Sequence, residues 1–423
     1  MMKNLRCLLL LVMTVMLVPA EAQVIDENIE NNEEVKEDSA WSDSVNTDTV
    51  TNLPWPKSVQ EKINKLLENK MFQTSQVGMM VWDLTADSCI FEKNEFQMMR
   101  PASCLKLLTA ITAIDRLGGS YQFKTQLRYT GKIENHTLTG DVYLVGGMDP
   151  RFNSDDLSAF ISNLKEMGVD SIHGSIYADK SMKDTNLYGE GWCWDDDNPT
   201  LSPLLISGKD QFMDRFISRL RESGVIFSPF STGTKRCPDD AFTVCTRYHS
   251  LDQILVRMLK ESDNLYAESL YYQVAASTGN HPASAKSARA VERKLIEKIG
   301  LDPSRYRLAD GSGLSLYNYI TPELLVRLLR YAYQNDNIYM HLHPALPIMG
   351  VDGTLEHRMH NAFTRGNVHA KTGTETGVVS LAGYCTAANS HLLCFAILNQ
   401  GVMHAVNARA FQDRVCISLC SPQ

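Results

Sequence analysis

Apolar and polar residues alternate with two different periods in the first part of the chain. Residues 58–71 place Val, Ile and Leu at helical spacing, which predicts an amphipathic helix. Residues 76–83, with the sequence QVGMMVWD, predict a strand, and residues 89–91 predict its hairpin partner. Between Pro101 and Gly118 the chain is apolar on nearly every face, which is typical of a buried helix. The pattern therefore predicts a compact opening unit of helix, hairpin and buried helix.

Residues 124–244 have a different pattern, in which short strands alternate with turns and helices. The predicted strands are 127–129, 141–145 and 171–178, and the predicted helices are 156–167 and 211–223. We interpret this segment as a smaller inserted α/β domain, which divides a second domain into residues 56–123 and 245–423.

The remainder of the chain predicts helices and two long strands. The helical segments are 250–276, 322–333 with Thr321 as N-cap, and 404–416, and the strands are 378–385 and 391–399. Four polar residues at 261–264 interrupt the first of these helical segments. A purely structural explanation is available for them, because Ser, Asp and Asn are all favoured at a helix N-terminus.

The N-terminus has the features of a secretory signal. Residues 1–22 combine the basic Lys3 and Arg6, an apolar run and an Ala-Glu-Ala cleavage site. The apolar run is short for a membrane span, so we expect an exported, periplasmic protein with weak membrane association at most. Residues 23–55 are acidic and poor in apolar residues, which predicts a disordered linker.

Charge and cysteine content narrow the function further. Residues 23–50 carry nine carboxylates and one lysine, which matches the formal net charge of −8 for the whole chain. The folded remainder is close to neutral and shows no basic stripe, which argues against a nucleic-acid partner. Nine cysteines follow the predicted signal, so at least one thiol is free or bonded to another chain. Pairs Cys237/Cys245 and Cys416/Cys420 are close enough in sequence to bond, but the spacing does not decide the connectivity.

Ser103 and Lys106 lie three residues apart at the start of the buried helix and so share one helix face. A lysine in apolar surroundings can lose its charge and take the proton of a neighbouring serine hydroxyl. The same spacing occurs at Ser162 and Lys165, in an amphipathic stretch that we interpret as a solvated helix face. The apolar surroundings, more than the spacing, therefore make Ser103 a candidate nucleophile.

Two further motifs follow in a known order. The triplet Ser-Asp-Asn occupies residues 262–264, and the triplet Lys-Thr-Gly occupies residues 371–373. Ser-x-x-Lys, Ser-Asp-Asn and Lys-Thr-Gly form the signature of class A β-lactamases and penicillin-binding proteins. Each triplet has a chance frequency on the order of one in several thousand positions, so their ordered occurrence is a strong signal.

Acyl transfer requires a nucleophile, a base, an oxyanion hole and a clamp for the substrate. We expect Lys106 to deprotonate Ser103 for acylation. Ser262 is expected to relay that proton to the leaving amine, and Asn264 to hold Lys106 or the substrate amide.

The third motif is expected to bind the substrate. Lys371, on an edge strand, supplies positive charge for the terminal carboxylate, and Thr372 and Thr374 add hydroxyl donors. Gly373 lets the substrate backbone approach the strand closely. The backbone N–H groups of Ser103 and Thr374 are expected to form the oxyanion hole.

From about residue 58 to residue 418 the chain resembles the penicillin-binding protein 4 type of D-alanyl-D-alanine carboxypeptidase/endopeptidase. Besides the three motifs, the resemblance rests on the stretches GDVYLVGGMDP, GEGWCWDD, ADGSGLSLYNYITP, MGVDGTLEHRM and HAKTGTETGVVSLAGY. It implies an α/β (α+β) serine penicillin-recognising fold, with an antiparallel sheet flanked by helices and the Ser103 helix between the sheet and a helical lobe. It also implies cleavage of D-Ala-D-Ala or cross-link bonds in peptidoglycan stem peptides, acylation by β-lactams, and no cofactor.

The resemblance also covers part of the insertion. The stretch that contains Trp192 and Asp195 resembles the region that contacts the far end of a diaminopimelate side chain. Three residues depart from the family pattern: Cys104 is unusual beside the nucleophile, Met148 stands where the family often has Gly, and Glu375 adds negative charge at a position that is often apolar.

Two alternatives belong to other functional classes. A class A serine β-lactamase uses an added glutamate and a water to hydrolyse its acyl-enzyme, and no Glu-x-x-Leu-Asn stretch lies between Ser262 and Lys371. A non-catalytic scaffold that binds the cell wall would be favoured by loss of Ser103 or Lys106, and both are present.

Overall fold

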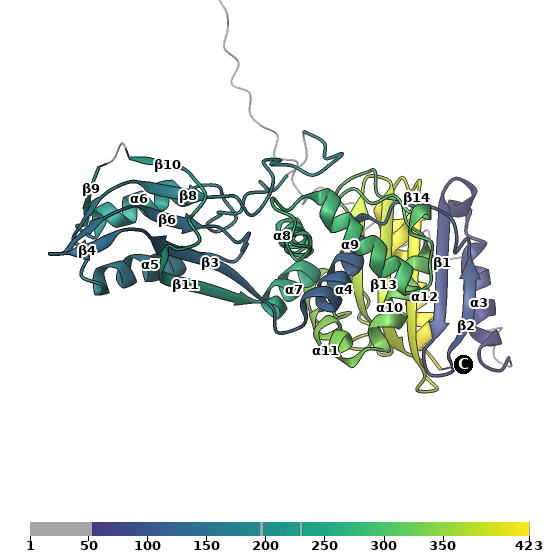
Figure 1. Cartoon of the computed structure of the whole chain (residues 1–423). Helices are drawn as coiled ribbons and strands as arrows, with labels where there is room; N and C mark the ends of the chain where they lie inside the picture. Colours follow the sequence, from purple (N-terminus) through teal and green to yellow (C-terminus); the bar gives the residue numbers. More distant parts are fainter. Residues whose placement is uncertain (1–52, 195–197, 229–230, 423) are drawn as a thin grey trace, which may run out of the picture. The chain divides into compact units, whose positions relative to one another are not determined.

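The computed structural model describes residues 53–194, 198–228 and 231–422 (Figure 1). The predicted signal peptide at residues 1–22 and nearly all of the linker predicted at residues 23–55 lie outside the described residues. Within the described ranges, no helix is long and apolar enough to cross a membrane. The nine cysteines there are all free thiols, so neither of the two pairs considered above forms a disulfide.

Five antiparallel strands form one sheet, in the order β12-β13-β14-β1-β2. These strands are β1 (Gln76–Asp83), β2 (Ser88–Lys93), β12 (His369–Glu375), β13 (Val378–Thr386) and β14 (Leu392–Gln400). The predicted hairpin and the two long predicted strands are confirmed. β13 and β14 are buried along most of their length, which explains their unbroken apolar sequences. β12 lies at an edge of the sheet, with β13 as its neighbour.

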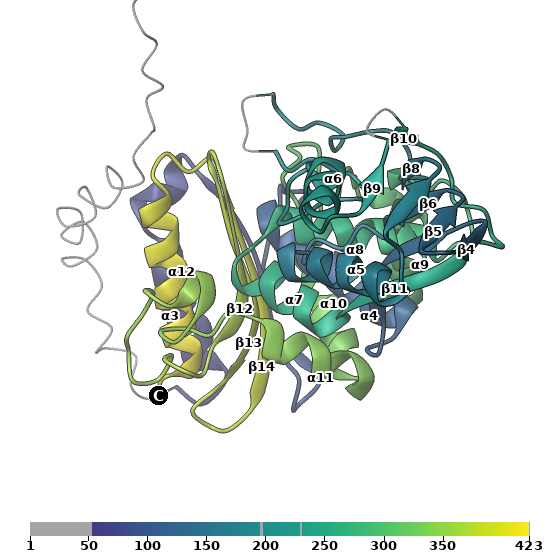
Figure 2. The ribbon, with the colours of Figure 1, turned by 90° about the vertical axis from the view of Figure 1, so that its left-hand side faces the viewer.

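Helices cover both faces of this sheet. α3 (Lys57–Leu67) and α12 (Ala405–Cys420) lie on one face. The other face carries a helical lobe of α4 (Lys106–Leu117), α7 (Leu251–Lys260), α8 (Asn264–Ala276), α9 (Ala285–Lys298), α10 (Pro322–Tyr333) and α11 (Asp336–Ala345). Figure 2 shows the sheet between α3 and α12 on one side and α7, α10 and α11 on the other. The predicted limits of α10 are confirmed, and the Thr321 side chain caps it by accepting from the Leu324 N–H.

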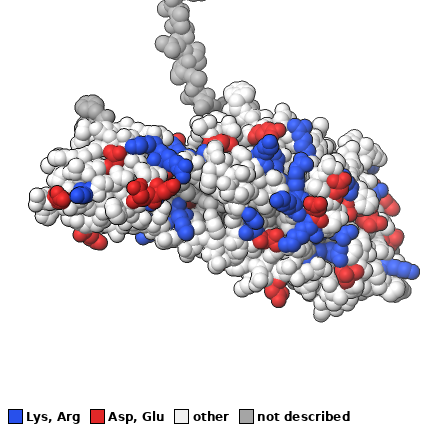
Figure 3. Space-filling model, in the orientation of Figure 1, with Lys and Arg blue, Asp and Glu red and all other residues white. Residues whose placement is uncertain are grey.

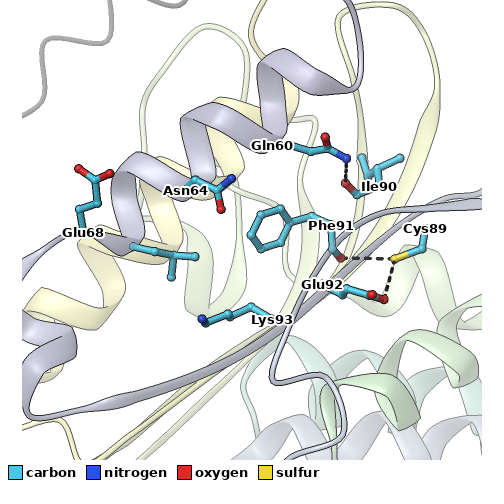
Figure 4. Close-up of a pocket in the computed structure, with 9 residues that line it drawn as sticks. Gln60, Asn64, Glu68, Cys89, Ile90, Phe91, Glu92 and Lys93 are labelled. Atoms are coloured by element: carbon cyan, nitrogen blue, oxygen red, sulfur yellow. Dashed lines mark hydrogen bonds between the residues drawn. The ribbon is translucent and has the colours of Figure 1, made fainter.

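α3 packs along β2 through a side-chain to backbone hydrogen bond. Gln60 Nε2 donates to the carbonyl oxygen of Ile90 over 2.8 Å (Figure 4). Beside this bond α3 and β2 enclose a cavity of about 540 Å³. None of the residues that line this cavity belongs to the three motifs.

The segment between α4 and α7 contains two smaller sheets, with the orders β10-β8-β6-β3-β11 and β4-β5-β7-β9. Its strands are β3 (Gln122–Tyr129), β4 (Lys132–Glu134), β5 (Thr137–Thr139), β6 (Val142–Val145), β7 (Ser171–His173), β8 (Ile176–Asp179), β9 (Ile226–Phe227), β10 (Thr232–Thr234) and β11 (Phe242–Ser250). Its helices are α5 (Ser154–Glu166) and α6 (Phe212–Glu222). Phe160, Phe212 and Phe216 are buried in a core of its own.

One prediction about this segment is wrong in detail. The strand predicted at 171–178 is two strands, β7 and β8, which belong to different sheets. The chain turns between them at Gly174, where a Cβ would lie 2.0 Å from the carbonyl oxygen of Gly140. Residues 244 and 245, where the second domain boundary is predicted, lie within β11, which pairs with β3 as far as Ser250 and Gln122. The division into domains stays a prediction.

Charges of both signs are interspersed on the described surface. Figure 3 shows Lys and Arg side chains in a band on the side that carries α9 and α10, with acidic side chains among them. An ion pair joins Lys298 on α9 to Asp115 on α4, with 2.8 Å between Nζ and Oδ1.

Candidate active site

Ser103 lies in a short 3₁₀ helix, η3 (Ala102–Leu105), that leads directly into α4. The prediction of a single α-helix from Pro101 is therefore wrong at its first turn, which is a tighter 3₁₀ turn and begins with a positive φ of 45° at Ala102. Gly313 packs against this turn, and a Cβ there would lie 2.0 Å from the Ala102 carbonyl oxygen. Tertiary contacts thus hold the serine in a conformation that helix propensity does not predict.

Lys106 is fully buried at the start of α4. Its Nζ lies 2.8 Å from Ser103 Oγ, 2.7 Å from Asn264 Oδ1 and 2.8 Å from the carbonyl oxygen of Ser312. Burial lowers the pKa of Lys106 to about 8, and the nearby carboxylates of Asp310 and Glu268 oppose this fall. The Asn264 and Ser312 oxygens are acceptors, so a neutral amine can donate to both and direct its lone pair at the Ser103 hydroxyl.

α8 places the second motif. Asp263 is the N-cap of α8, with its side chain accepting from the Tyr266 N–H, as the structural explanation of the polar interruption expects. Ser262 adopts a positive φ of 60° just before this cap. The residues on either side of Asp263 reach the two lysines: Asn264 contacts Lys106, and Ser262 Oγ lies 2.9 Å from Lys371 Nζ.

Glu268 is a part of the site that the sequence analysis missed. It lies one turn after Asn264 on α8 and is 1% exposed. Its Oε1 accepts the backbone N–H groups of Gly311, over 2.9 Å, and Ser312, over 2.8 Å. α8 therefore positions Lys106 in two ways. Asn264 accepts from Lys106 directly, and Glu268 holds the loop at Gly311 and Ser312, whose Ser312 carbonyl oxygen also accepts from Lys106. Burial raises the pKa of the Glu268 carboxyl to about 8. The available signal was a glutamate four residues after Asn264 in an otherwise apolar stretch.

Lys371 lies on the edge strand β12, as predicted, and is fully buried. Besides contacting Ser262, its Nζ lies 2.8 Å from the carbonyl oxygen of Thr372. Burial, together with the nearby charge of Lys106, lowers the pKa of Lys371 to about 7. The Thr372 hydroxyl donates to Thr354 Oγ1 over 2.8 Å, whereas Thr374 is exposed.

The structure therefore brings together five of the residues predicted from the three motifs. Two short chains of contacts form, one joining Ser103, Lys106 and Asn264 and the other joining Ser262 and Lys371. A serine hydroxyl beside an amine of lowered pKa, with a second lysine nearby, is the arrangement used for nucleophilic acyl transfer.

The sequence matches the family model described as D-Ala-D-Ala carboxypeptidase 3 (S13) over residues 59–207 and 205–417. This chain belongs to that family. It is 26% identical over 413 residues to D-alanyl-D-alanine carboxypeptidase DacB of Haemophilus influenzae, covering 78% of this chain and 86% of the relative. It is 25% identical over 459 residues to the D-alanyl-D-alanine carboxypeptidase of an Actinomadura species, covering 85% of this chain and 84% of the relative.

Among solved structures, penicillin binding protein 4 from Haemophilus influenzae matches this fold with a TM-score of 0.78 and 23% identity, over 85% of this chain and 99% of that chain. The same protein complexed with a β-lactam matches with a TM-score of 0.72 and 24% identity, over 85% and 100% of the two chains. The family expected from the sequence, and the α/β fold with an antiparallel sheet flanked by helices, are therefore confirmed.

In this member of the S13 family, the absence of a side chain at Gly373 has a structural reason that the motif alone does not indicate. A Cβ at Gly373 would lie 2.3 Å from Ser380 Oγ, 2.8 Å from the Pro101 carbonyl oxygen and 2.9 Å from the Ser103 nitrogen. The missing side chain thus lets β12 pack against the turn that carries the nucleophile. Close approach of a substrate backbone at Gly373 stays a prediction.

Cys104 connects η3, in which it lies, with β12. It is fully buried, and its thiol donates to the carbonyl oxygen of Lys371 over 3.1 Å. Burial raises the pKa of the Cys104 thiol. The departure from the family pattern therefore places a small, uncharged side chain between η3 and β12.

Trp192 contacts the loop of residues 310–315, whose Ser312 carbonyl oxygen accepts from Lys106. Its Nε1 donates to Asp310 Oδ2 over 2.8 Å, and the same carboxylate accepts from the backbone N–H groups of Gly313 and Ser315. The indole N–H is therefore occupied by the protein itself, and contact between the ring and a substrate stays a prediction. Asp195, its predicted partner, lies outside the described residues.

The other two departures also have local explanations. Met148 has a positive φ of 53°, which favours glycine, and its buried side chain packs beside Leu201 and Leu205. Glu375 ends β12 and is one of four carboxylates that oppose the lowering of the Lys106 pKa by burial. In the described part of the chain, no group of three His, Cys, Asp or Glu side chains could hold a metal ion.

Proposed function

We propose that this chain is a serine D,D-carboxypeptidase that cleaves the D-Ala-D-Ala bond of peptidoglycan stem peptides through an acyl-enzyme on Ser103. Membership of the D-Ala-D-Ala carboxypeptidase 3 (S13) family supports the reaction class. The observation that carries the proposal is the 2.8 Å contact between Ser103 Oγ and the Nζ of a fully buried Lys106. Cleavage of D,D cross-links is included, because it breaks the same kind of bond.

In this mechanism the neutral Lys106 amine takes the proton of Ser103 as Oγ attacks the carbonyl carbon of the penultimate D-Ala. The backbone N–H groups of Ser103 and Thr374 receive the negative charge on the carbonyl oxygen. The proton then passes to the leaving amine, with Ser262 as the relay. A water molecule attacks the ester carbon, and the freed Ser103 oxygen takes up a proton as the acid product leaves.

Lys371 holds the terminal carboxylate of the substrate in this proposal. Its lowered pKa is compatible with that role, because a carboxylate that enters the site favours the charged form of the lysine. The contact with Ser262 links this anion clamp to the proposed proton relay. Thr372 and Thr374 lie on the same strand and are assigned as further substrate donors.

Further parts of the proposal concern location, inhibition and domain organisation. We assign residues 1–22 to an export signal, residues 23–55 to an acidic linker, and the mature enzyme to the periplasm. Residues 124–244 are assigned to an inserted domain, and residues 56–123 and 245–423 to the catalytic domain. The complex of a relative with a β-lactam supports acylation of this enzyme by such inhibitors.

Acylation by a fluorescent penicillin, followed over time by intact-mass spectrometry, tests the proposal. We expect one stable adduct on the wild-type protein and none on Ser103→Ala. Ser162→Ala is the matched control, because Ser162 has the same Ser-x-x-Lys spacing on the exposed face of α5. Rapid turnover of the penicillin would indicate a β-lactamase, and absence of any adduct would leave the scaffold alternative. Release of D-Ala from a peptide ending in D-Ala-D-Ala then separates a carboxypeptidase from a protein that only binds penicillin.

A further inference from the structure

A second cavity, of about 330 Å³, adjoins the Ser-Asp-Asn motif. One side is formed by the inserted segment, at Arg151 and at Ser207 and Gly208, and the other by Arg257 of α7 and the first residues of α8. Asp263, which lines the cavity, is flanked in the chain by Ser262 and Asn264, the two residues that contact the buried lysines. The cavity is therefore next to the proposed catalytic site in the chain, but none of the five residues assigned to catalysis lines it.

Two guanidinium groups give this cavity an excess of positive charge. Arg257 is already engaged, because its Nε lies 3.0 Å from Asp263 Oδ2 and its guanidinium lies 5.2 Å from the centre of the Tyr266 ring. Arg151 makes no side-chain hydrogen bond or ion pair with the described residues, and its buried Nε has no partner. A buried donor without a partner is costly, so this guanidinium is a candidate to receive an anion.

The backbone at Arg151 is held in place although its side chain is not. Asp149, which is 2% exposed, accepts the Arg151 N–H through Oδ1 over 3.0 Å. Its other oxygen lies 2.7 Å from His249 Nδ1 on β11. The turn that presents Arg151 is thus fixed by a buried carboxylate, which reduces the conformational freedom that a ligand would have to restrict.

We propose that Arg151, supported by Arg257, forms a subsite for a carboxylate of the substrate other than its terminal carboxylate. The inference rests on the proposed function, which assigns the terminal carboxylate to Lys371. A guanidinium presents paired N–H donors that match the two oxygens of a carboxylate. Peptidoglycan stem peptides carry further free carboxylates along their length, and an extended peptide advances about 3.3 Å per residue, so a neighbouring cavity is within reach. The inserted segment would then contribute to the choice of substrate.

The experiment compares peptides that end in D-Ala-D-Ala and differ in one amide. One peptide keeps all its carboxylates, and in each of the others a single internal carboxylate is converted to the carboxamide. We expect one of these amidations to lower kcat/KM of the wild type by about 10- to 100-fold, the usual worth of a hydrogen bond to a charged group. Arg151→Gln should lower kcat/KM for the acidic peptide by a similar factor and cause no further loss with that amidated peptide. Arg151→Lys should restore part of the loss.

Arg219→Gln is the matched control for loss of one positive charge, because Arg219 is an exposed residue of α6. Equal losses on acidic and amidated peptides in Arg151→Gln would overturn the subsite and indicate a structural role for Arg151. So would wild-type activity that no amidation changes. Failure of the proposed function is separate, since it would appear as no cleavage of any peptide. Calorimetry on Ser103→Ala then still tests the subsite, which predicts tighter binding of the acidic peptide than of its amidated form and is overturned by equal binding.

Discussion

Two Ser-x-x-Lys sequences in this chain have the same spacing and opposite surroundings. Ser103 and Lys106 lie where η3 meets α4, and Lys106 is fully buried with three oxygen atoms within 2.8 Å of its Nζ. Ser162 and Lys165 are exposed on α5, and Lys165 pairs with Asp170 at the surface. Only the buried lysine has a reason to lose its charge near neutral pH, because only there does the protein replace water around the amine. The motif therefore gains its proposed chemistry from its environment.

The largest expected effect comes from replacing Lys106, with Lys165 as the comparison. Lys106→Met should slow acylation by penicillin by about 10²–10⁴-fold, the usual contribution of a positioned general base. Lys165→Met should leave the acylation rate as in the wild type, because its ion pair is exposed. The measurement is the second-order rate constant for adduct formation. Equal rates for Lys106→Met and the wild type would remove the base from the mechanism.

The pH dependence of the same rate should sharpen the contrast. Acylation requires neutral Lys106, whose pKa is about 8, and charged Lys371, whose pKa is about 7. The rate should therefore fall about tenfold per pH unit from about pH 7 downward, as Lys106 gains its proton, and from about pH 8 upward, as Lys371 loses its proton. The profile should therefore be bell-shaped, with its maximum between these two values. Lys165→Met should keep this profile, and a rate that is flat from pH 6 to pH 9 would contradict the assignment of both lysines.

Glu268 supports the position of Lys106 through the loop at Gly311 and Ser312. Glu268→Ala leaves the N–H groups of Gly311 and Ser312 without their acceptor, which should lower the free energy of unfolding by about 2–5 kcal/mol. Because the Ser312 carbonyl would then be less well placed, acylation should slow by roughly tenfold. Glu268→Gln keeps an acceptor oxygen and should lie close to the wild type in both measurements.

Denaturant titration and acylation kinetics test these two effects together. Glu222→Ala, at an exposed position of α6, is the control for loss of a carboxylate. If Glu268→Ala lost stability but kept the wild-type acylation rate, the loop would stabilise the fold without positioning Lys106.

The smallest effect is expected at Cys104. The thiol makes one weak hydrogen bond to Lys371, so Cys104→Ala should change acylation by less than about threefold and cost about 1 kcal/mol of stability. The same two measurements apply. A tenfold loss of acylation would show that the contact between η3 and β12 at this residue positions Ser103, and that its role extends beyond packing.

Local pattern predicted most of the elements, because their signals lie within a few residues of each other. The limits of α10 followed from Thr321 and Pro322, and β13 and β14 from two continuous apolar runs. Local pattern failed where a distant contact decides the conformation. β7 and β8 have apolar residues typical of one strand, but the close approach of the Gly140 carbonyl to Gly174 separates them into two sheets.

By itself the sequence determined the three motifs, their order, the membership of the family and the burial of the segment around Ser103. These properties depend on residue types and on periodicity, which a linear chain already contains. Only the tertiary structure decided the 3₁₀ turn at Ser103, the double hold of α8 on Lys106, and the meeting of β12 with the nucleophile at Gly373. Each of these joins residues that are far apart in the chain, and the lowered pKa of Lys106 exists only when folding removes water from around it.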